Sequence, residues 1–199
     1  MNNTKVIRYS PDKNLFYSVK KCCDIEETFQ PIVNKLNEQT VEFPKTIIYC
    51  RSLKDCGEIY SLFDSPHVAM YHSRTPEKIK KQVLESVMDE NGKCRVVIAT
   101  SALGMGVNIQ DVRRIIHYGI PHDLESYVQE VGRGGRDGKP CEAVLYYRPF
   151  HLAHCDEDTR SFIKNTEKQC RRQVIMSYFK EKPNEPDTTR LLRYMPGKL

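Results

Sequence analysis

The chain has 199 residues, of which 39% are hydrophobic and 29% charged, and its formal net charge is +5 with a pI near 8.7. This composition excludes a disordered or fibrous protein and predicts a globular one with its own hydrophobic core. The basic bias is compatible with nucleic-acid binding but is too small to establish it.

Eight cysteines are spread along the chain without a C-x-x-C pair. Zinc modules need ligands at close spacing, and disulfide frameworks are typical of short secreted chains. We therefore expect free thiols in an intracellular protein, several of them buried as small hydrophobic side chains. The N-terminal residues contain no apolar segment of signal-peptide type, and no apolar run is long enough to span a bilayer, so no membrane association is expected.

Strand-like segments recur along the first part of the chain. Residues 1–13 are polar and predict a linker or leading arm, after which NLFYSVK at 14–20 alternates in the manner of a short strand. KTIIYC at 45–50 is an apolar run typical of a strand buried on both faces. HVAMYH at 67–72 predicts a third strand.

A helix is expected between the first two strands. Apolar residues recur at helical spacing over residues 24–39. Two starts are compatible with the sequence. Either Asp24, together with Glu27, caps the helix, or Pro31 is its first helical residue.

The alternation continues in the next segments. Ser52 is a predicted N-cap for the following helix, and Thr75-Pro76 begin another one. The apolar face of this later helix is expected to comprise Ile79, Val83, Val87 and Met88. Asn91-Gly92 predict a turn into CRVVIAT at 94–100, the most strand-like run in the sequence.

After a glycine-containing loop at 101–111, a strand at 113–120, a helix and a strand at 142–147 follow. Strands thus alternate with helices, which predicts an α/β fold whose parallel sheet is covered by helices on both faces. Ligands of such sheets bind at the carboxyl ends of the strands. The loops expected along that edge are Arg51–Ser52, His72–Thr75, Thr100–Asp111 and Gly132–Gly138.

Two arginines stand three residues apart among glycines in SYVQEVGRGGRDG, residues 126–138. Glycines remove side chains from the neighbourhood, so we expect Arg133 and Arg136 to stand clear and approach a large anion. Planar guanidinium groups match phosphate oxygens with paired hydrogen bonds. The alternative is a flexible basic turn on a solvated surface, since short basic motifs often match falsely.

Three motifs in order resemble motifs four, five and six of superfamily-two helicases, and their wording is similar to that of the RecQ family of DNA helicases. They are IIYCRS at 47–52, VVIATSALGMGVNIQDVRRIIHYGIP at 96–121, and the arginine motif at 126–138. DEAD-box relatives usually carry a histidine-arginine pair where this chain has Gln129-Glu130. The resemblance covers residues 14–179 and implies a RecA-like fold of P-loop NTPase type, here the second motor domain, over 14–148.

The resemblance also implies roles for individual residues. Arg136 matches the arginine finger that meets the γ-phosphate of ATP, Arg133 matches the second motif-six arginine, and Gln129 matches a nucleotide-sensing glutamine. Gly104, Gly106 and Asn108 match the motif-five turn, in which Asn108 presents a polar group toward the nucleotide. Contacts with single-stranded DNA phosphates are implied for Thr100 and Ser101, and more weakly for Arg51, Ser52, His72 and Arg74.

Half of an ATPase site has no counterpart in this sequence. Neither G-x-x-x-x-G-K-[ST] nor a D-E-x-H box is present, and in the family both belong to a preceding RecA-like domain, which holds most of the contacts to ATP and Mg²⁺. The expected function is the second motor domain of a 3′-to-5′ DNA helicase, inactive as an ATPase alone. Its expected partners are DNA and a first motor domain. The family implies a nuclear location, with the cytoplasm as the alternative. The alternative is a truncated, non-catalytic module that binds nucleic acid or a protein partner.

The C-terminal part differs in composition. Residues 149–180 predict a helical extension that resembles the start of the RecQ zinc-binding segment, with Cys170 as its first ligand. No cysteine follows Cys170, which argues against a complete zinc site, and we expect no metal site elsewhere. His117 lies inside a predicted strand, where packing is the simpler role. Residues 181–199 are rich in charge and proline, which is typical of a disordered tail.

Overall fold

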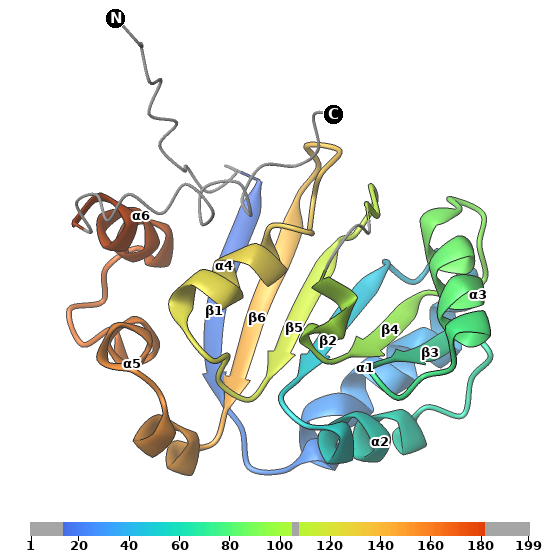
Figure 1. Ribbon diagram of the computed structural model, residues 1–199, viewed down its shortest axis with the longest axis horizontal. Helices are drawn as coiled ribbons and strands as arrows, with labels where there is room; N and C mark the ends of the chain where they lie inside the picture. The colour runs from blue at the N-terminus through green and yellow to red at the C-terminus, as the bar shows by residue number, and fades with distance from the viewer. Residues whose placement is uncertain (1–13, 105–107, 182–199) are drawn as a thin grey trace, which may run out of the picture.

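The computed structural model describes residues 14–104 and 108–181, and its centre is one six-stranded sheet in the order β1-β6-β5-β2-β4-β3 (Figure 1). Every pair of neighbouring strands is parallel. The strands are β1 Leu15–Lys21, β2 Thr46–Cys50, β3 Val68–Tyr71, β4 Val96–Ala99, β5 Arg114–Tyr118 and β6 Cys141–Tyr147. The predicted parallel α/β fold is confirmed.

Helices cover both faces of this sheet. They are α1 Ile25–Gln39, α2 Leu53–Leu62, α3 Glu77–Met88, α4 Leu124–Val131, α5 Glu157–Lys164 and α6 Arg171–Glu181. Buried side chains of α1 and α2 pack on one face, and those of the other four helices pack on the opposite face. Because the β2 run is buried at all five positions, it reads as continuously apolar in the sequence.

Capping residues set the helix starts. The Asp24 carboxylate accepts the N–H of Glu27 at 2.7 Å, so α1 begins at Ile25 and Pro31 lies inside the helix rather than at its start. The Ser52 hydroxyl accepts the N–H of Asp55 at 3.0 Å, which confirms the predicted N-cap of α2.

The apolar face predicted for α3 is only half right. Val83 and Val87 are buried, whereas Ile79 is 44% exposed and Met88 is 47% exposed. The helix lies over the β3 edge of the sheet, where fewer strands stand beneath it (Figure 1). Its buried stripe is therefore narrower than the sequence pattern indicates.

One loop lies at the opposite edge from the one the sequence predicted. Segment 132–138 follows α4 and precedes β6, and the N–H of Gly135 donates to the carbonyl of Val112, just before β5, at 2.9 Å. The Asn14 side chain, just before β1, donates to the Gly135 carbonyl at 2.7 Å. A segment that leads into a parallel strand must lie at the amino ends of the strands, so α4 carries the chain from the carboxyl edge back across the sheet (Figure 1).

The C-terminal segment is helical, as predicted. A 3₁₀ helix at Pro149–His154 leads into α5 and α6, and the Arg172 side chain donates to the carbonyl of Leu15 on β1 at 2.6 Å. The likeness of this segment to a zinc-binding segment stays a prediction. The linker predicted for residues 1–13 lies outside the described residues, as does nearly all of the tail predicted for 181–199.

Candidate functional site

The two motif-six arginines lie on a tightly held loop, residues 132–138, here called the arginine loop. The side chain of Arg113, the residue just before β5, binds both carboxylate oxygens of Asp137, with Nη1 and Oδ1 2.9 Å apart. The hydrogen bond from Arg113 lowers the pKa of Asp137 below its usual value. This anchor fixes the loop immediately after Arg136.

The glycines of the arginine loop serve close packing. A Cβ on Gly134 would lie 2.3 Å from the sulfur of Cys141, and a Cβ on Gly135 would lie 2.4 Å from the Asn14 side-chain nitrogen. Gly135 also has a φ of +62°, which side chains rarely adopt. The interpretation that these glycines clear space around the arginines is wrong for Gly134 and Gly135, because both are buried against neighbouring strands.

Arg133 and Arg136 are both half-buried. Nη1 of Arg136 donates to the side-chain oxygen of Asn108 at 2.8 Å, and its Nε donates to the carbonyl of Gly132 at 3.3 Å. Burial and the positive charge of Arg133 lower the pKa of Arg136, yet a guanidinium keeps its proton in proteins. The structure therefore concentrates positive charge at one place and brings Asn108 to it.

An ion pair between a buried lysine and a partly exposed aspartate anchors the segment that carries Asn108. The Lys45 ammonium is almost fully buried, lies 3.0 Å from the carboxylate of Asp111, and donates to the carbonyl of Asp89 at 2.8 Å. Gln129 is half-buried on the last turn of α4, next to the arginine loop. Gly106 lies outside the described residues.

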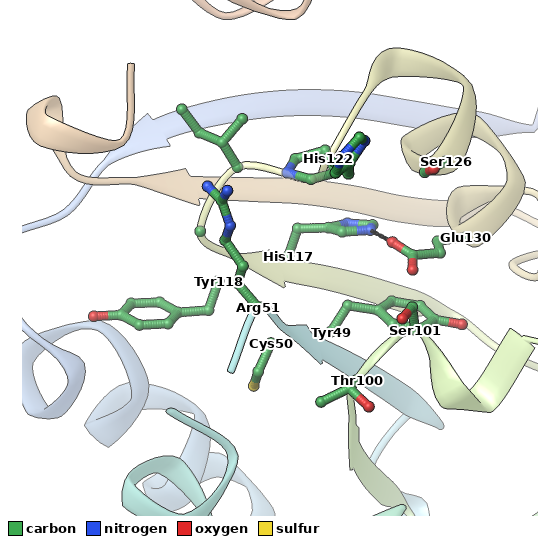
Figure 2. Close-up of a pocket in the computed structure, with 13 residues that line it drawn as sticks. Tyr49, Cys50, Arg51, Thr100, Ser101, His117, Tyr118, His122, Ser126 and Glu130 are labelled. Carbon is green, nitrogen blue, oxygen red and sulfur yellow. Dashed lines mark hydrogen bonds and ion pairs between the residues drawn. The ribbon is translucent and has the colours of Figure 1, made fainter. Parts of the chain in front are cut away.

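Beside the arginines lies a group that we call the His117 cluster: Tyr49, His117 and Glu130. Nε2 of His117 lies 2.9 Å from a carboxylate oxygen of Glu130, and the two side chains are 3% and 14% exposed. The imidazole stacks on the ring of Tyr49, with centroids 5.1 Å apart and planes 20° apart. Figure 2 shows the imidazole pointing toward Glu130. The predicted packing role of His117 is confirmed.

The same cluster shares its electrostatic surroundings with the arginines. Burial raises the pKa of the Tyr49 hydroxyl, while the positive charges of Arg133 and Arg136 lower it and the negative charge of Glu130 raises it. The N–H of Arg133 donates to the backbone carbonyl of Glu130 at 3.3 Å. The His117 cluster and the arginine loop are therefore contiguous.

A pocket of about 450 Å³ opens at the carboxyl edge of the sheet (Figure 2). Its lining residues are Tyr49, Cys50, Arg51, Thr100, Ser101, His117, Tyr118, Gly119, Ile120, Pro121, His122, Ser126 and Glu130. Three residues for which the resemblance implied nucleic-acid contact, Arg51, Thr100 and Ser101, therefore meet here. The His117 cluster also belongs to this lining.

The other three predicted contact residues are not part of that lining. The Ser52 hydroxyl caps α2 and donates to a carboxylate oxygen of Asp55 at 2.6 Å. His72 and Arg74 form a tight turn after β3, in which the N–H of Arg74 donates to Nδ1 of His72 at 3.2 Å. His72 and Arg74 thus lie at the β3 edge of the sheet, whereas Ser52 follows the central strand β2 and is next to Arg51 of the pocket lining.

Sequence reasoning missed the His117 cluster as a unit. Tyr49 and His117 are cross-strand partners of β2 and β5, and Glu130 comes from α4. These residues meet only because β2 and β5 are neighbours in the sheet. Between Tyr49 and His117 lie 67 residues of chain, so no local sequence motif contains both.

Within residues 14–104 and 108–181, no group of three or more histidine, cysteine or acidic side chains is arranged to hold a metal ion. All eight cysteines are free thiols, and six of them are buried, as the sequence predicted. Cys170 is exposed. No helix in the part of the chain that the structure describes combines the length and apolar character needed to cross a membrane.

Curated relatives are similar to this chain over most of its length. A protein of Acanthamoeba polyphaga mimivirus that carries the name of an ATP-dependent RNA helicase is 31% identical over 93% of this chain and 36% of its own length. The mouse bifunctional 3′-5′ exonuclease/ATP-dependent helicase WRN is 33% identical over 85% of this chain and 13% of its own length. The ATP-dependent DNA helicase RecQ of Haemophilus influenzae is 31% identical over 81% of this chain and 29% of its own length. The chain thus spans about a third or less of these relatives.

Solved structures share the fold. The Mycobacterium smegmatis helicase Lhr bound to ssDNA and AMP-PNP matches 77% of this chain and 22% of its own, with a TM-score of 0.57 and 20% identity. Dbp5 of S. cerevisiae, bound to RNA and ADP BeF3, matches 87% of this chain and 40% of its own, with a TM-score of 0.58 and 18% identity.

The predicted likeness to RecQ helicases and the RecA-like fold are confirmed by these relatives and structures. The family described as "Helicase conserved C-terminal domain" matches residues 27–138, a span that contains both the arginine loop and the His117 cluster. The chain therefore belongs to the family of helicase conserved C-terminal domains.

Proposed function

We propose that this chain acts as the second motor domain of a RecQ-type, ATP-dependent 3′-to-5′ DNA helicase. In this role Arg136 and Arg133 contact phosphate groups of an ATP that a first RecA-like domain holds. The observation that carries the proposal is the arginine loop, on which two half-buried guanidinium groups stand close together with Asn108 bound to one of them.

The donor set suits a triphosphate. Guanidinium groups form paired hydrogen bonds with phosphate oxygens, and they stabilise charge that develops on a phosphoryl group during its transfer. The Arg113–Asp137 pair holds the arginine loop, and the Lys45–Asp111 pair holds the segment that carries Asn108. These donors are therefore already in place before ATP binds, and binding costs little further conformational entropy. ATP would supply the phosphoryl group that is transferred. In this proposal the first domain would hold Mg²⁺ together with the ATP.

Single-stranded DNA is the proposed occupant of the pocket at the carboxyl edge. Thr100 and Ser101 offer hydroxyl groups there, and exposed Arg51 offers a positive charge, which suits contact with phosphates of the strand backbone. The curated relatives include ATP-dependent DNA helicases of RecQ name, which supports DNA over RNA. The mimivirus relative carries the name of an RNA helicase, so RNA needs its own arm in the test.

The test combines this chain with the first motor domain of a RecQ relative and measures ATP hydrolysis with and without single-stranded DNA or RNA. The combination should hydrolyse ATP at a rate that DNA stimulates more than RNA does, and this chain alone should not hydrolyse ATP. Stronger stimulation by RNA would overturn the choice of nucleic acid. A combined rate no higher than that of the first domain alone, with either nucleic acid, would favour a non-catalytic binding module.

A further inference from the structure

The His117 cluster lies where the pocket and the arginine loop come closest. Tyr49, His117 and Glu130 all line the pocket, although the arginine loop sits at the other edge of the sheet. The connection is the last turn of α4, which carries Glu130 into the pocket lining and continues directly into Arg133. The N–H of Arg133 is bonded to the carbonyl of Glu130, so the two residues share one turn of backbone.

The side chains of Glu130 and His117 are held in one conformation by their mutual contact and by the packing around the imidazole. Their 2.9 Å contact is formed by side chains that are only 14% and 3% exposed, and the imidazole is packed between the rings of Tyr49 and Tyr127. Removing one member of a buried pair leaves the other without its partner, which is costly, so the pair does not exchange freely with water. Glu130 also places a negative charge at the wall of a pocket where we propose a phosphate binds.

A charge in that position responds to the pocket's occupant. A phosphate beside Ser101 and Thr100 repels the Glu130 carboxylate and attracts the exposed Arg51. Because the carboxylate is bound to a ring that stacks on Tyr49 of β2, a shift of Glu130 relative to that ring would also displace the last turn of α4, which carries Glu130. Any such shift reaches Arg133 through its N–H, which is bonded to the Glu130 carbonyl, and Arg136 through its Nε–H, which is bonded to the Gly132 carbonyl.

We propose that the Glu130–His117 pair is a positioning unit that couples a single strand in the pocket to the placement of Arg133 and Arg136. This inference rests on the proposed function, since it takes the pocket's occupant to be a nucleic-acid strand. Neither residue touches the nucleotide. The competing explanation is that the pair only stabilises α4 against the sheet.

The test follows the arginine side chains of this chain directly. Nε–Hε signals of Arg133 and Arg136 are recorded by NMR while an oligothymidylate of about 12 nucleotides is added, a length within the range of single-strand sites. The unmodified chain should show both signals shifting as the oligonucleotide binds. In Glu130→Ala the oligonucleotide should still bind, while the shifts of both arginine signals fall about fivefold or more. Glu130→Gln keeps an oxygen that can accept the His117 N–H but removes the charge that the phosphate repels, so its arginine shifts should fall as those of Glu130→Ala do.

Two further variants separate coupling from stability. His117→Phe keeps an aromatic ring on Tyr49 but lacks the nitrogen that meets Glu130, so it should lose the arginine shifts as Glu130→Ala does, even if Glu130→Ala folds poorly. Glu125→Gln removes a carboxylate from the same helix at a position that meets Tyr178 instead of the pocket, and its shifts should match those of the unmodified chain.

The outcomes distinguish this inference from the proposed function. If the unmodified chain binds no oligonucleotide, the proposed nucleic-acid site and the coupling both fail. If His117→Phe binds the oligonucleotide and its arginine signals still shift in full, the coupling alone fails, and the pair has only a structural role. In the complex with a first motor domain, Glu130→Ala should lower the maximal DNA-stimulated ATPase rate about tenfold while the DNA concentration for half-stimulation stays unchanged.

Discussion

Arg113 donates hydrogen bonds from both terminal nitrogens to the carboxylate of Asp137, and its Nη1 lies 2.9 Å from Oδ1. The two residues are 24 positions apart, one just before β5 and the other directly after Arg136. Their pairing ties the arginine loop to the amino edge of the sheet. The site's positive charge is therefore held by the fold instead of lying on a flexible basic turn.

Removing the Asp137 charge should loosen this anchor. We expect Asp137→Asn to lower the free energy of unfolding by about 1 kcal/mol at neutral pH, the upper range for a partly exposed ion pair. Urea unfolding followed by circular dichroism measures this difference. The control is Lys54→Ala, which breaks an exposed pair with Glu58 on α2 and should cost no more than about 0.5 kcal/mol.

The contribution of Asp137 should depend on pH in one direction. Because the hydrogen bond from Arg113 lowers its folded-state pKa below the usual 3.8, the pair stabilises the fold above that value. The stabilisation is lost as pH falls through the lower, folded-state pKa. The gap between the unmodified chain and Asp137→Asn should therefore narrow only below about pH 4. A gap that closes between pH 8 and pH 5 would show that another group is responsible.

Replacing glycine by alanine should lower the stability of the fold at one position and raise it at another. Gly134→Ala drives a methyl group onto the sulfur of Cys141, and we expect it to destabilise the fold by about 1–3 kcal/mol. Gly57 lies inside α2, where a Cβ would meet nothing within 4 Å, so Gly57→Ala should stabilise by up to about 1 kcal/mol. Thermal unfolding of both variants decides the point, and equal effects at the two positions would contradict the packing role of Gly134.

The thiols should differ in reactivity. Burial raises the pKa of Cys141 to about 12 and that of Cys94 to about 11, so neither is a thiolate near neutral pH. Cys23 and Cys170 are exposed. Alkylation of the folded chain with iodoacetamide, followed by peptide mass spectrometry, should label Cys23 and Cys170 first. Labelling of Cys141 at a similar rate would mean that the arginine loop opens readily above it.

Local features of the fold are readable from the sequence. Ser52 was identifiable as a cap, and Asp24 as one of two possible helix starts, because a capping side chain acts on a backbone group only three residues away. The five buried positions of β2 were identifiable because a strand covered on both faces needs an uninterrupted apolar run. The family resemblance was also identifiable from the sequence, because each of the three motifs is a short continuous segment.

Features that depend on strand order were not readable in the same way. The arginine loop was predicted at the carboxyl edge, yet it precedes a parallel strand and lies at the amino edge. The stacking of Tyr49 on His117 requires that β2 and β5 be neighbours, although β3 and β4 stand between them in the sequence. The exposure of Ile79 could not be predicted from the sequence either, because it depends on how far the sheet extends under α3.

The central claim is that Arg136 acts on a triphosphate held by another domain, and hydrolysis in the combined helicase tests it most directly. With a first motor domain and saturating single-stranded DNA, Arg136→Ala should lose ATP hydrolysis by about a thousandfold while ATP binding to the first domain persists. Arg114→Ala, which removes an arginine paired with Glu142 on the sheet, should hydrolyse ATP at nearly the unmodified rate. If Arg136→Ala hydrolysed ATP as fast as Arg114→Ala does, the assignment of the arginine loop to the nucleotide would be wrong.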